Sequence, residues 1–179
     1  MNLTRPFFSI CIPAYNRIQH LEPLLDSIIA QSFESYEIII CEDQSRERAQ
    51  IAKIVNKYSN KHPGKIKYYE NSINLGYDAN IRKLIKKSNG KYCFFMGNDD
   101  LMCPGALQHV REVIERHPKI GMVLKSYAWF DNIPTEINQE IRYFSDERFF
   151  KAGEEAVSIC FRRAGVISGY IIHRDPAFA

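Results

Sequence analysis

Long hydrophobic runs are missing from this sequence. None of its apolar stretches approaches the ~20 residues that a helix needs to cross a bilayer. The N-terminus also lacks the apolar core and the small-residue cleavage site of a secretion signal. We therefore expect a cytoplasmic protein, and peripheral contact with the inner face of a membrane stays open.

Paired cysteines are missing as well. The five cysteines form no CxxC motif and have no zinc-like spacing. Cys11, Cys41 and Cys93 lie inside apolar runs, where a reduced cysteine behaves as a small hydrophobic residue. An odd number of cysteines in such positions indicates a reducing compartment rather than a disulfide framework.

A strong charge of either sign is also absent. The 24 basic and 21 acidic residues leave a net charge of +3 over 179 residues. The basic residues are scattered, except for Lys83, Lys86 and Lys87 on one expected helix, which we interpret as a solvated helix face. We therefore expect no nucleic-acid partner. The length fits one domain, or one domain and part of a second.

Several common catalytic motifs do not occur. The sequence has no GxGxxG after its first expected strand and no GxxxxGK[ST], which excludes the usual dinucleotide and P-loop cradles. It has no HExxH and no GxSxG either. A phosphate site without a glycine-rich loop needs another positive charge. Carboxylates that hold Mg²⁺ or Mn²⁺ can supply it.

Short apolar runs alternate with amphipathic helical segments along the first two thirds of the chain. The runs predict strands at residues 7–12, 36–41, 66–70, 91–96 and 120–124. This alternation predicts an α/β fold with a mainly parallel central sheet and helices on both faces. After residue 126 no clean period remains, and residues 166–173 read as one more strand.

Polar residues follow three of the predicted strands: residues 13–17, Glu42-Asp43, and Gly97-Asn98-Asp99-Asp100. In an open parallel sheet, ligands bind at the carboxyl ends of the strands. Asp43 suits either a ligand N–H or the cap of the following helix. Asp99 and Asp100 suit either a divalent cation or the N-terminus of the helix after Pro104. The residues alone leave both alternatives open.

Four segments in register resemble family 2 glycosyltransferases of the GT-A fold: SICIPAYNR, EIIICEDQS, NLGYDANI and GKYCFFMGNDD, the last followed by PGAL. The resemblance runs from about residue 8 to residue 123. It implies that residues 1–125 form the Rossmann-like half that binds a nucleotide sugar. Residues 1–179 would then be a single GT-A domain, truncated on its acceptor side.

The resemblance also assigns residues to the site. It implies that the base and ribose are lined by Pro13, Ala14, Tyr15 and Arg17. It implies that Asp43 accepts a base N–H, usually of uracil, that Asn80 and Asn98 lie near the nucleotide sugar, and that Asp99 binds Mg²⁺ or Mn²⁺ on the diphosphate.

The sequence departs from the family pattern in three respects. Gly97 stands where the first Asp of the DxD-type motif is expected, and Ala79 stands where an Arg usually precedes Asn80. The GNDD form resembles the branch that contains abequosyltransferase-like enzymes. No convincing general base follows, because the acidic pairs Asp146-Glu147 and Glu154-Glu155 lie in the wrong context.

The function implied is transfer of a sugar from a nucleotide-sugar donor to an acceptor hydroxyl in bacterial surface polysaccharide or lipid-linked glycan synthesis. A UDP-sugar is favoured over CDP-, GDP- and dTDP-sugars. One alternative is a nucleotide-sugar-binding domain without turnover, which the missing carboxylate and base favour. Another is a nucleotidyltransferase-like α/β enzyme, but this needs a glycine-rich basic segment that is absent after the first strand.

Overall fold

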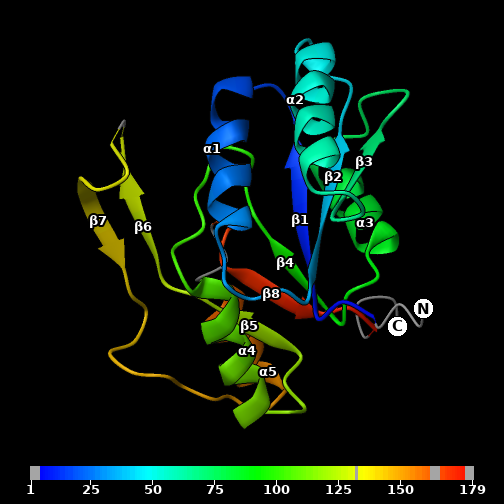
Figure 1. The fold of residues 1–179 in the computed structure, drawn as a ribbon. Coiled ribbons are helices and arrows are strands. Elements are labelled where there is room, and N and C mark those ends of the chain that lie inside the picture. The colour runs from blue at the N-terminus through cyan, green and yellow to red at the C-terminus, as the bar shows by residue number, and fades with distance from the viewer. Residues whose placement is uncertain (1–4, 132, 162–165, 176–179) are drawn as a thin grey trace.

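A six-stranded sheet forms the centre of the molecule (Figure 1). The computed structural model describes residues 5–131, 133–161 and 166–175. The strand order is β3-β2-β1-β4-β8-β5, with β1 (Phe8–Ala14), β2 (Tyr36–Glu42), β3 (Ile66–Glu70), β4 (Tyr92–Phe95), β5 (Met122–Leu124) and β8 (Tyr170–His173). β1 to β4 are parallel, and β8 is antiparallel to both of its neighbours. The mainly parallel sheet expected from the sequence is confirmed.

Helices cover both faces of the sheet, as predicted. α1 (Ile18–Ile29), α2 (Arg48–Lys61) and α4 (Ala106–Arg116) contribute to the hydrophobic cluster on one face, and α3 (Tyr77–Lys87) contributes to the cluster on the other. In the described part of the chain, no helix combines the length and the apolar character needed to cross a bilayer.

Alternating side chains of the central strands build these two clusters. Ile10 and Ile12 of β1 pack on the face of α1, whereas Cys11 between them joins Ile39 and Leu84 in the cluster of α3. All of these side chains are fully buried. A parallel sheet covered on both faces requires such continuous apolar runs, which explains why the strands are readable in the sequence. All five cysteines are free thiols.

The chain beyond β5 is less regular. β6 (Tyr127–Phe130) and β7 (Ile137–Ile141) pair as a separate antiparallel hairpin that stands beside the main body in Figure 1, and α5 (Glu154–Phe161) follows. Most side chains of this hairpin are exposed, including Trp129. Because the hairpin buries little, its sequence carries no clear hydrophobic period.

In the sheet, strand β8 lies between β4 and β5. Along the chain, however, β5 is the next strand after β4. Phe94 of β4 pairs with Ile171 of β8, and Ile171 also pairs with Val123 of β5. The strand predicted at residues 166–173 is therefore confirmed at Tyr170–His173. Its antiparallel direction and its position inside the sheet are findings of the structure.

Gly90 sits at a close approach between two segments of backbone. Its N–H donates to Ser9 Oγ at 2.8 Å, and Ser9 Oγ donates to the buried carboxylate of Glu37 at 2.6 Å. A Cβ atom on Gly90 would lie 2.4 Å from Ser9 N and 2.6 Å from the carbonyl carbon of Phe8. Neither backbone atom can move without disturbing the pairing of β1 with β4.

Replacing Gly90 with alanine should therefore destabilise the fold. We expect Gly90→Ala to lower the free energy of unfolding by about 1–3 kcal/mol, the usual cost of forcing an extra methyl group into a packed site. The matched control is Gly121→Ala, because a Cβ there meets no atom within 4 Å. Chemical denaturation followed by circular dichroism measures both. Equal midpoints for the two variants would contradict the close approach.

Candidate functional site

The carboxyl ends of β1, β2 and β4 meet at one edge of the sheet, as expected for parallel neighbours. Three non-glycine residues near this edge have a positive φ: Asn16 (55°), Arg17 (60°) and Gln44 (57°). A positive φ is uncommon outside glycine, and strained backbone of this kind clusters at functional sites. The strain marks the loops after β1 and β2 as the candidate site.

Two contacts join the loop after β1 to the loop after β4. The Arg17 guanidinium forms an ion pair with the Asp99 carboxylate. The side-chain amide of Asn98 donates to the backbone carbonyl of Asn16 at 2.9 Å. The side chain of Arg17 is 60% exposed and that of Asp99 is 35% exposed, so both groups can reach a ligand.

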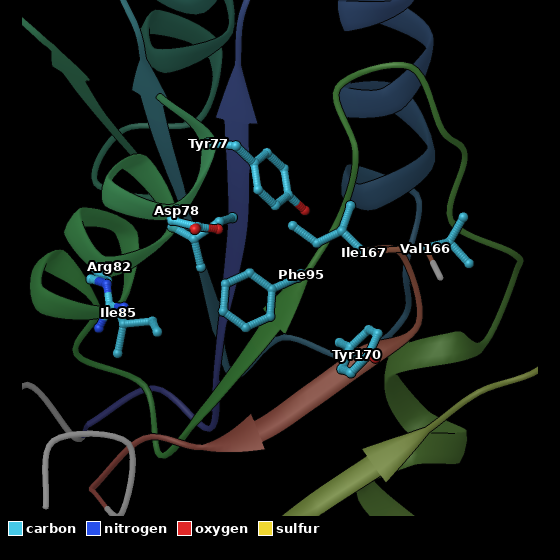
Figure 2. Close-up of a pocket in the computed structure, with 9 residues that line it drawn as sticks. Tyr77, Asp78, Arg82, Ile85, Phe95, Val166, Ile167 and Tyr170 are labelled. Carbon is cyan, nitrogen blue, oxygen red and sulfur yellow. The ribbon is translucent and has the colours of Figure 1, made fainter. Parts of the chain in front are cut away.

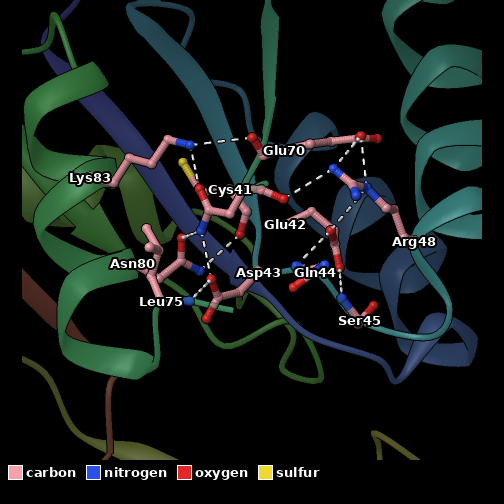
Figure 3. A network of polar contacts seen from close by, with 11 residues as sticks. Cys41, Glu42, Asp43, Gln44, Ser45, Arg48, Glu70, Leu75, Asn80 and Lys83 are labelled. Carbon is pink, nitrogen blue, oxygen red and sulfur yellow. Dashed lines mark hydrogen bonds and ion pairs between the residues drawn. The ribbon is translucent and has the colours of Figure 1, made fainter. Parts of the chain in front are cut away.

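Asp43 fixes the loop that precedes α3 (Figure 3). Its Oδ1 accepts hydrogen bonds from Asn71 Nδ2 at 2.6 Å and from the Leu75 N–H at 2.8 Å, and its Oδ2 accepts one from the Gly76 N–H at 2.9 Å. The residue is buried. A carboxylate offers about four acceptor positions, and these hydrogen bonds use three of them.

The helix-capping alternative for Asp43 is wrong. The next helix begins at Arg48, its N-cap position is Glu47, and no side chain caps it. The backbone N–H groups of Gln44 and Ser45 instead bind Glu42, at 2.9 and 2.6 Å. The fully buried Glu42 thus accepts the hydrogen bonds of the turn after β2, and the Asp43 carboxylate is not used in that turn.

Asn80 lies behind Asp43 in the same network. Its Nδ2 donates to the carbonyl of Cys41 at 3.0 Å, and its Oδ1 accepts from Asn71 Nδ2 at 3.1 Å. Lys83 donates to Asn71 Oδ1. Asn80 is buried, so its visible role is to orient Asn71 and, through it, Asp43. Sequence reasoning missed Asn71; its only signal is a polar residue directly after β3.

The predicted segment after β1 divides into buried and exposed residues. Ala14 is fully buried, and its carbonyl accepts the Asp43 N–H at 3.0 Å. Pro13 is half-buried within β1. Tyr15 is 49% exposed, so it is Tyr15 and Arg17 that present side chains to solvent. We call Tyr15, Arg17, Asp43, Asn98 and Asp99 the strand-end site.

The carboxylate of Asp100 lies against Gly97. A Cβ on Gly97 would be 2.5 Å from Asp100 Oδ2 and 3.2 Å from Asp99 Oδ1. The Ser168 hydroxyl donates to Asp100 and accepts the Gly97 N–H at 2.7 Å. Burial raises the pKa of the Asp100 carboxyl, although the hydrogen bond from Ser168 opposes this rise. Asp100 therefore occupies the space that a side chain at position 97 would need.

Asp99 and Asp100 do not serve the following helix. α4 begins at Ala106, its N-cap is Gly105, and its first turn contains no acidic residue. The alternative that places these carboxylates at the helix N-terminus is therefore wrong. Sequence reasoning did not find the role of Ser168, because it depends on the insertion of β8 beside β4.

A divalent cation fits this edge only together with a phosphate ligand. Among the described residues, no three His, Cys, Asp or Glu side chains gather closely enough to hold a metal by themselves. Mg²⁺ needs only one or two protein carboxylates when phosphate oxygens and water complete its shell. The exposed Asp99 carboxylate meets this requirement.

Curated relatives match most of the region just described. Abequosyltransferase RfbV of Salmonella typhimurium is 32% identical over 112 residues, which cover 63% of this chain and 34% of that protein. Putative glycosyltransferase EpsE of Bacillus subtilis is 26% identical over 126 residues, 70% of this chain and 45% of that protein. The chain therefore spans less than half the length of each.

Solved structures share the fold. S. aureus TarS is 27% identical with a TM-score of 0.60, and the match covers 65% of this chain and 34% of that one. TarS has been solved in complex with UDP and with UDP-GlcNAc. Mannosyltransferase PcManGT from Pyrobaculum calidifontis, solved with GDP-Man and Mn²⁺, is 19% identical with a TM-score of 0.61 and covers 68% of this chain. The fold is of the GT-A type.

The family model for glycosyl transferase family 2 matches residues 9–170, which include every residue of the strand-end site. The expected resemblance is confirmed, and the chain belongs to glycosyl transferase family 2.

Proposed function

We propose that this protein binds a nucleotide-diphosphate sugar at the strand-end site and transfers the sugar to an acceptor hydroxyl. The observation that carries the proposal is the convergence of an exposed guanidinium, an exposed carboxylate and a preorganised buried carboxylate at one edge of the sheet. A nucleotide diphosphate presents matching groups, namely a base N–H, a ribose and charged phosphates.

UDP is the favoured nucleotide, ahead of CDP, GDP and dTDP. Asp43 keeps one acceptor position beyond its three internal hydrogen bonds, and the N–H of a uracil ring can fill it. Tyr15, in the loop after β1, offers an exposed ring on which the base can stack. The complexes of TarS with UDP support this choice of base.

The diphosphate would lie between Arg17 and the loop after β4. Asp99, with Asn98 beside it, would hold Mg²⁺ or Mn²⁺, which when bound offsets the charge on the departing diphosphate. Arg17 already forms an ion pair with Asp99 and can turn its guanidinium to phosphate oxygens, for which its planar fork is well suited. The GDP-Man and Mn²⁺ complex of PcManGT has the same kinds of ligand on the same fold.

Transfer also needs a base that takes the proton of the acceptor hydroxyl as its oxygen bonds to the anomeric carbon. Glu147 is held by Arg116 and His117, and Glu154 and Glu155 lie in the first turn of α5. None of these lies in the strand-end site, so we assign no base. Binding without turnover therefore stays the second candidate, favoured by Gly97 at the first position of the triplet.

We further propose that residues 1–179 belong to one GT-A domain, with residues 1–125 as its nucleotide-sugar-binding half. The acceptor would be a glycan or a lipid-linked glycan of a bacterial surface polysaccharide pathway. The protein would work in the cytoplasm, with peripheral contact at the inner face of the membrane.

Removing the charge of Asp43 tests the base-binding role. In Asp43→Asn an NH₂ donor replaces one carboxylate oxygen, so a single acceptor oxygen is left to serve the base N–H and the loop N–H groups. We expect UDP to bind at least ~10-fold more weakly, as for the loss of a hydrogen bond to a charged group. Isothermal titration calorimetry measures the affinity, with circular dichroism as the folding check.

The control for that experiment is Glu112→Gln, which removes one negative charge from the exposed surface of α4. It should bind UDP as the unchanged protein does. Wild-type affinity in Asp43→Asn, or no UDP binding by the unchanged protein, would contradict the proposal.

Replacing Asp99 tests the metal. Mn²⁺ should strengthen UDP binding by the unchanged protein, and Asp99→Asn should lose most of that gain. Its affinity without Mn²⁺ should not fall, because Arg17, freed from its ion pair, stays available to phosphate. Calorimetric titrations with and without Mn²⁺ give the comparison. A full Mn²⁺ effect in Asp99→Asn would remove Asp99 from the metal site.

A further inference from the structure

The outer side of α3 is basic. The helix packs on β1 and β2 and buries Asn80 and Leu84 on that side. Four basic side chains lie on its other sides, in two rows one turn apart, because residues i and i+4 of a helix are neighbours. We call them the basic face: Arg82, Lys83, Lys86 and Lys87. Lys83 is half-buried and the other three are exposed.

Arg82 is the member of the basic face that lies nearest the middle of α3. Figure 2 shows it on the helix, at the rim of a hollow that is also lined by Tyr77 and Phe95. Its side chain is exposed, so its guanidinium is free to meet a partner that approaches α3 from outside.

The basic face has no acidic partner. Among the described residues, none of its four charges forms an ion pair with a carboxylate. Lys83 donates only to neutral oxygens, among them the backbone carbonyl of Glu70 at 3.4 Å. The carboxylate of Glu70 pairs with Arg48 instead. The Lys87 ammonium lies 4.8 Å from the centre of the Tyr69 ring. All four positive charges therefore stay uncompensated.

Helix α2 provides an internal contrast. It also contains four basic residues, but Arg48 pairs with Glu70 and Lys57 pairs with Glu22. α2 packs in the hydrophobic cluster on the opposite face of the sheet from α3. Uncompensated charge over the whole outer side is thus a property of α3 and not of both basic helices.

The helix dipole explains only part of the pattern. Basic side chains in the last turn interact favourably with the C-terminal end of a helix, and Lys86 and Lys87 occupy that turn. Arg82 and Lys83 lie one turn earlier, where this effect has faded. Like charges at positions i and i+4 destabilise a helix slightly, and the basic face contains two such pairs. A negatively charged surface would relieve this repulsion.

An anionic lipid bilayer matches the basic face best. Clusters of roughly four to eight Lys and Arg on an amphipathic helix are typical of anionic-lipid binding. The face carries no aromatic or amide side chain with which to stack on or read nucleic-acid bases. An apolar protein segment on this face would bury its charges without partners, at a high cost. Because the apolar side of α3 packs on the sheet, contact would be with the head groups alone.

We propose that the basic face docks on an anionic lipid bilayer and holds the strand-end site next to the membrane. Arg82 lies six residues after Gly76, ~9 Å along the helix axis, and the Gly76 N–H binds Asp43 of the strand-end site. A lipid-linked acceptor can then reach the site while its lipid stays in the bilayer. The inference rests on the proposed function, because only a bound nucleotide sugar provides a donor for that acceptor.

Co-sedimentation of the full chain with lipid vesicles tests the docking. The protein should bind vesicles of phosphatidylglycerol and phosphatidylcholine in equal parts at about 0.05 M NaCl. It should lose most of this binding at about 0.5 M NaCl, and on pure phosphatidylcholine. The double variant Arg82→Gln/Lys86→Gln should bind about 25-fold more weakly, since each basic residue near an anionic surface contributes about fivefold. Glutamine is a good helix former, and circular dichroism checks the fold.

The matched control is the double variant Lys53→Gln/Lys61→Gln. It removes two exposed positive charges from α2, on the opposite face of the sheet, and so changes the net charge by the same amount. It should bind the vesicles as the unchanged protein does.

Three results would overturn the inference: no binding to the anionic vesicles at low salt, an equal loss in the two double variants, or binding of single-stranded RNA through Arg82 and Lys86 without vesicle binding. UDP titration of the same samples separates the two proposals. A chain that binds vesicles through the basic face but does not bind UDP keeps its membrane surface and refutes the proposed function. A chain that binds UDP in every variant but no vesicle refutes the membrane surface alone.

Discussion

The carboxylate of Asp43 binds two backbone N–H groups and one side-chain amide, and the geometry of the strand-end site depends on these hydrogen bonds. They fasten the loop before α3 to the end of β2, and α3 itself contacts β1 and β2. The cost of burying a carboxylate is offset only when its oxygens are satisfied. Asn71 donates both to Asp43 and to Asn80, and Asn80 donates to the carbonyl of Cys41, so one hydrogen-bond network joins the loop, the helix and the strand.

The opposite side of the edge is held more loosely. Asn16 and Arg17 keep a strained backbone, and the ion pair of Arg17 with Asp99 is open to solvent. Exposed ion pairs contribute little to stability, so this contact can be exchanged for phosphate at low cost. An Asp43 carboxylate held by internal hydrogen bonds and an exchangeable ion pair at Asp99 together suit the nucleotide sugar proposed above, with its base held firmly and its diphosphate released.

Much of this arrangement could be predicted from the sequence, because buried parallel strands leave continuous apolar runs. Those runs predict that Asp43 and Asp99 lie at strand ends. Because the strands are parallel, their carboxyl ends lie at the same edge of the sheet. The residues that tune the site could not be found in this way. Asn71 carries no periodic signal, and the positive φ of Arg17 leaves no mark in a non-glycine residue. The close approach of the Asp100 carboxylate to Gly97 depends on how the loop after β4 folds. Ser168 depends on a strand of four residues, too short to encode its direction.

The position of β8 has a consequence for the order in which the sheet can form. β4 is a central strand that leads into Asn98 and Asp99 of the strand-end site, yet its outer neighbour is supplied by Tyr170–His173, about 80 residues later in the chain. During synthesis β4 therefore remains an open edge, able to pair with other strands, until residues 170–173 have left the ribosome. Closure of the sheet and completion of the Gly97–Ser168–Asp100 contact are thus the same late event.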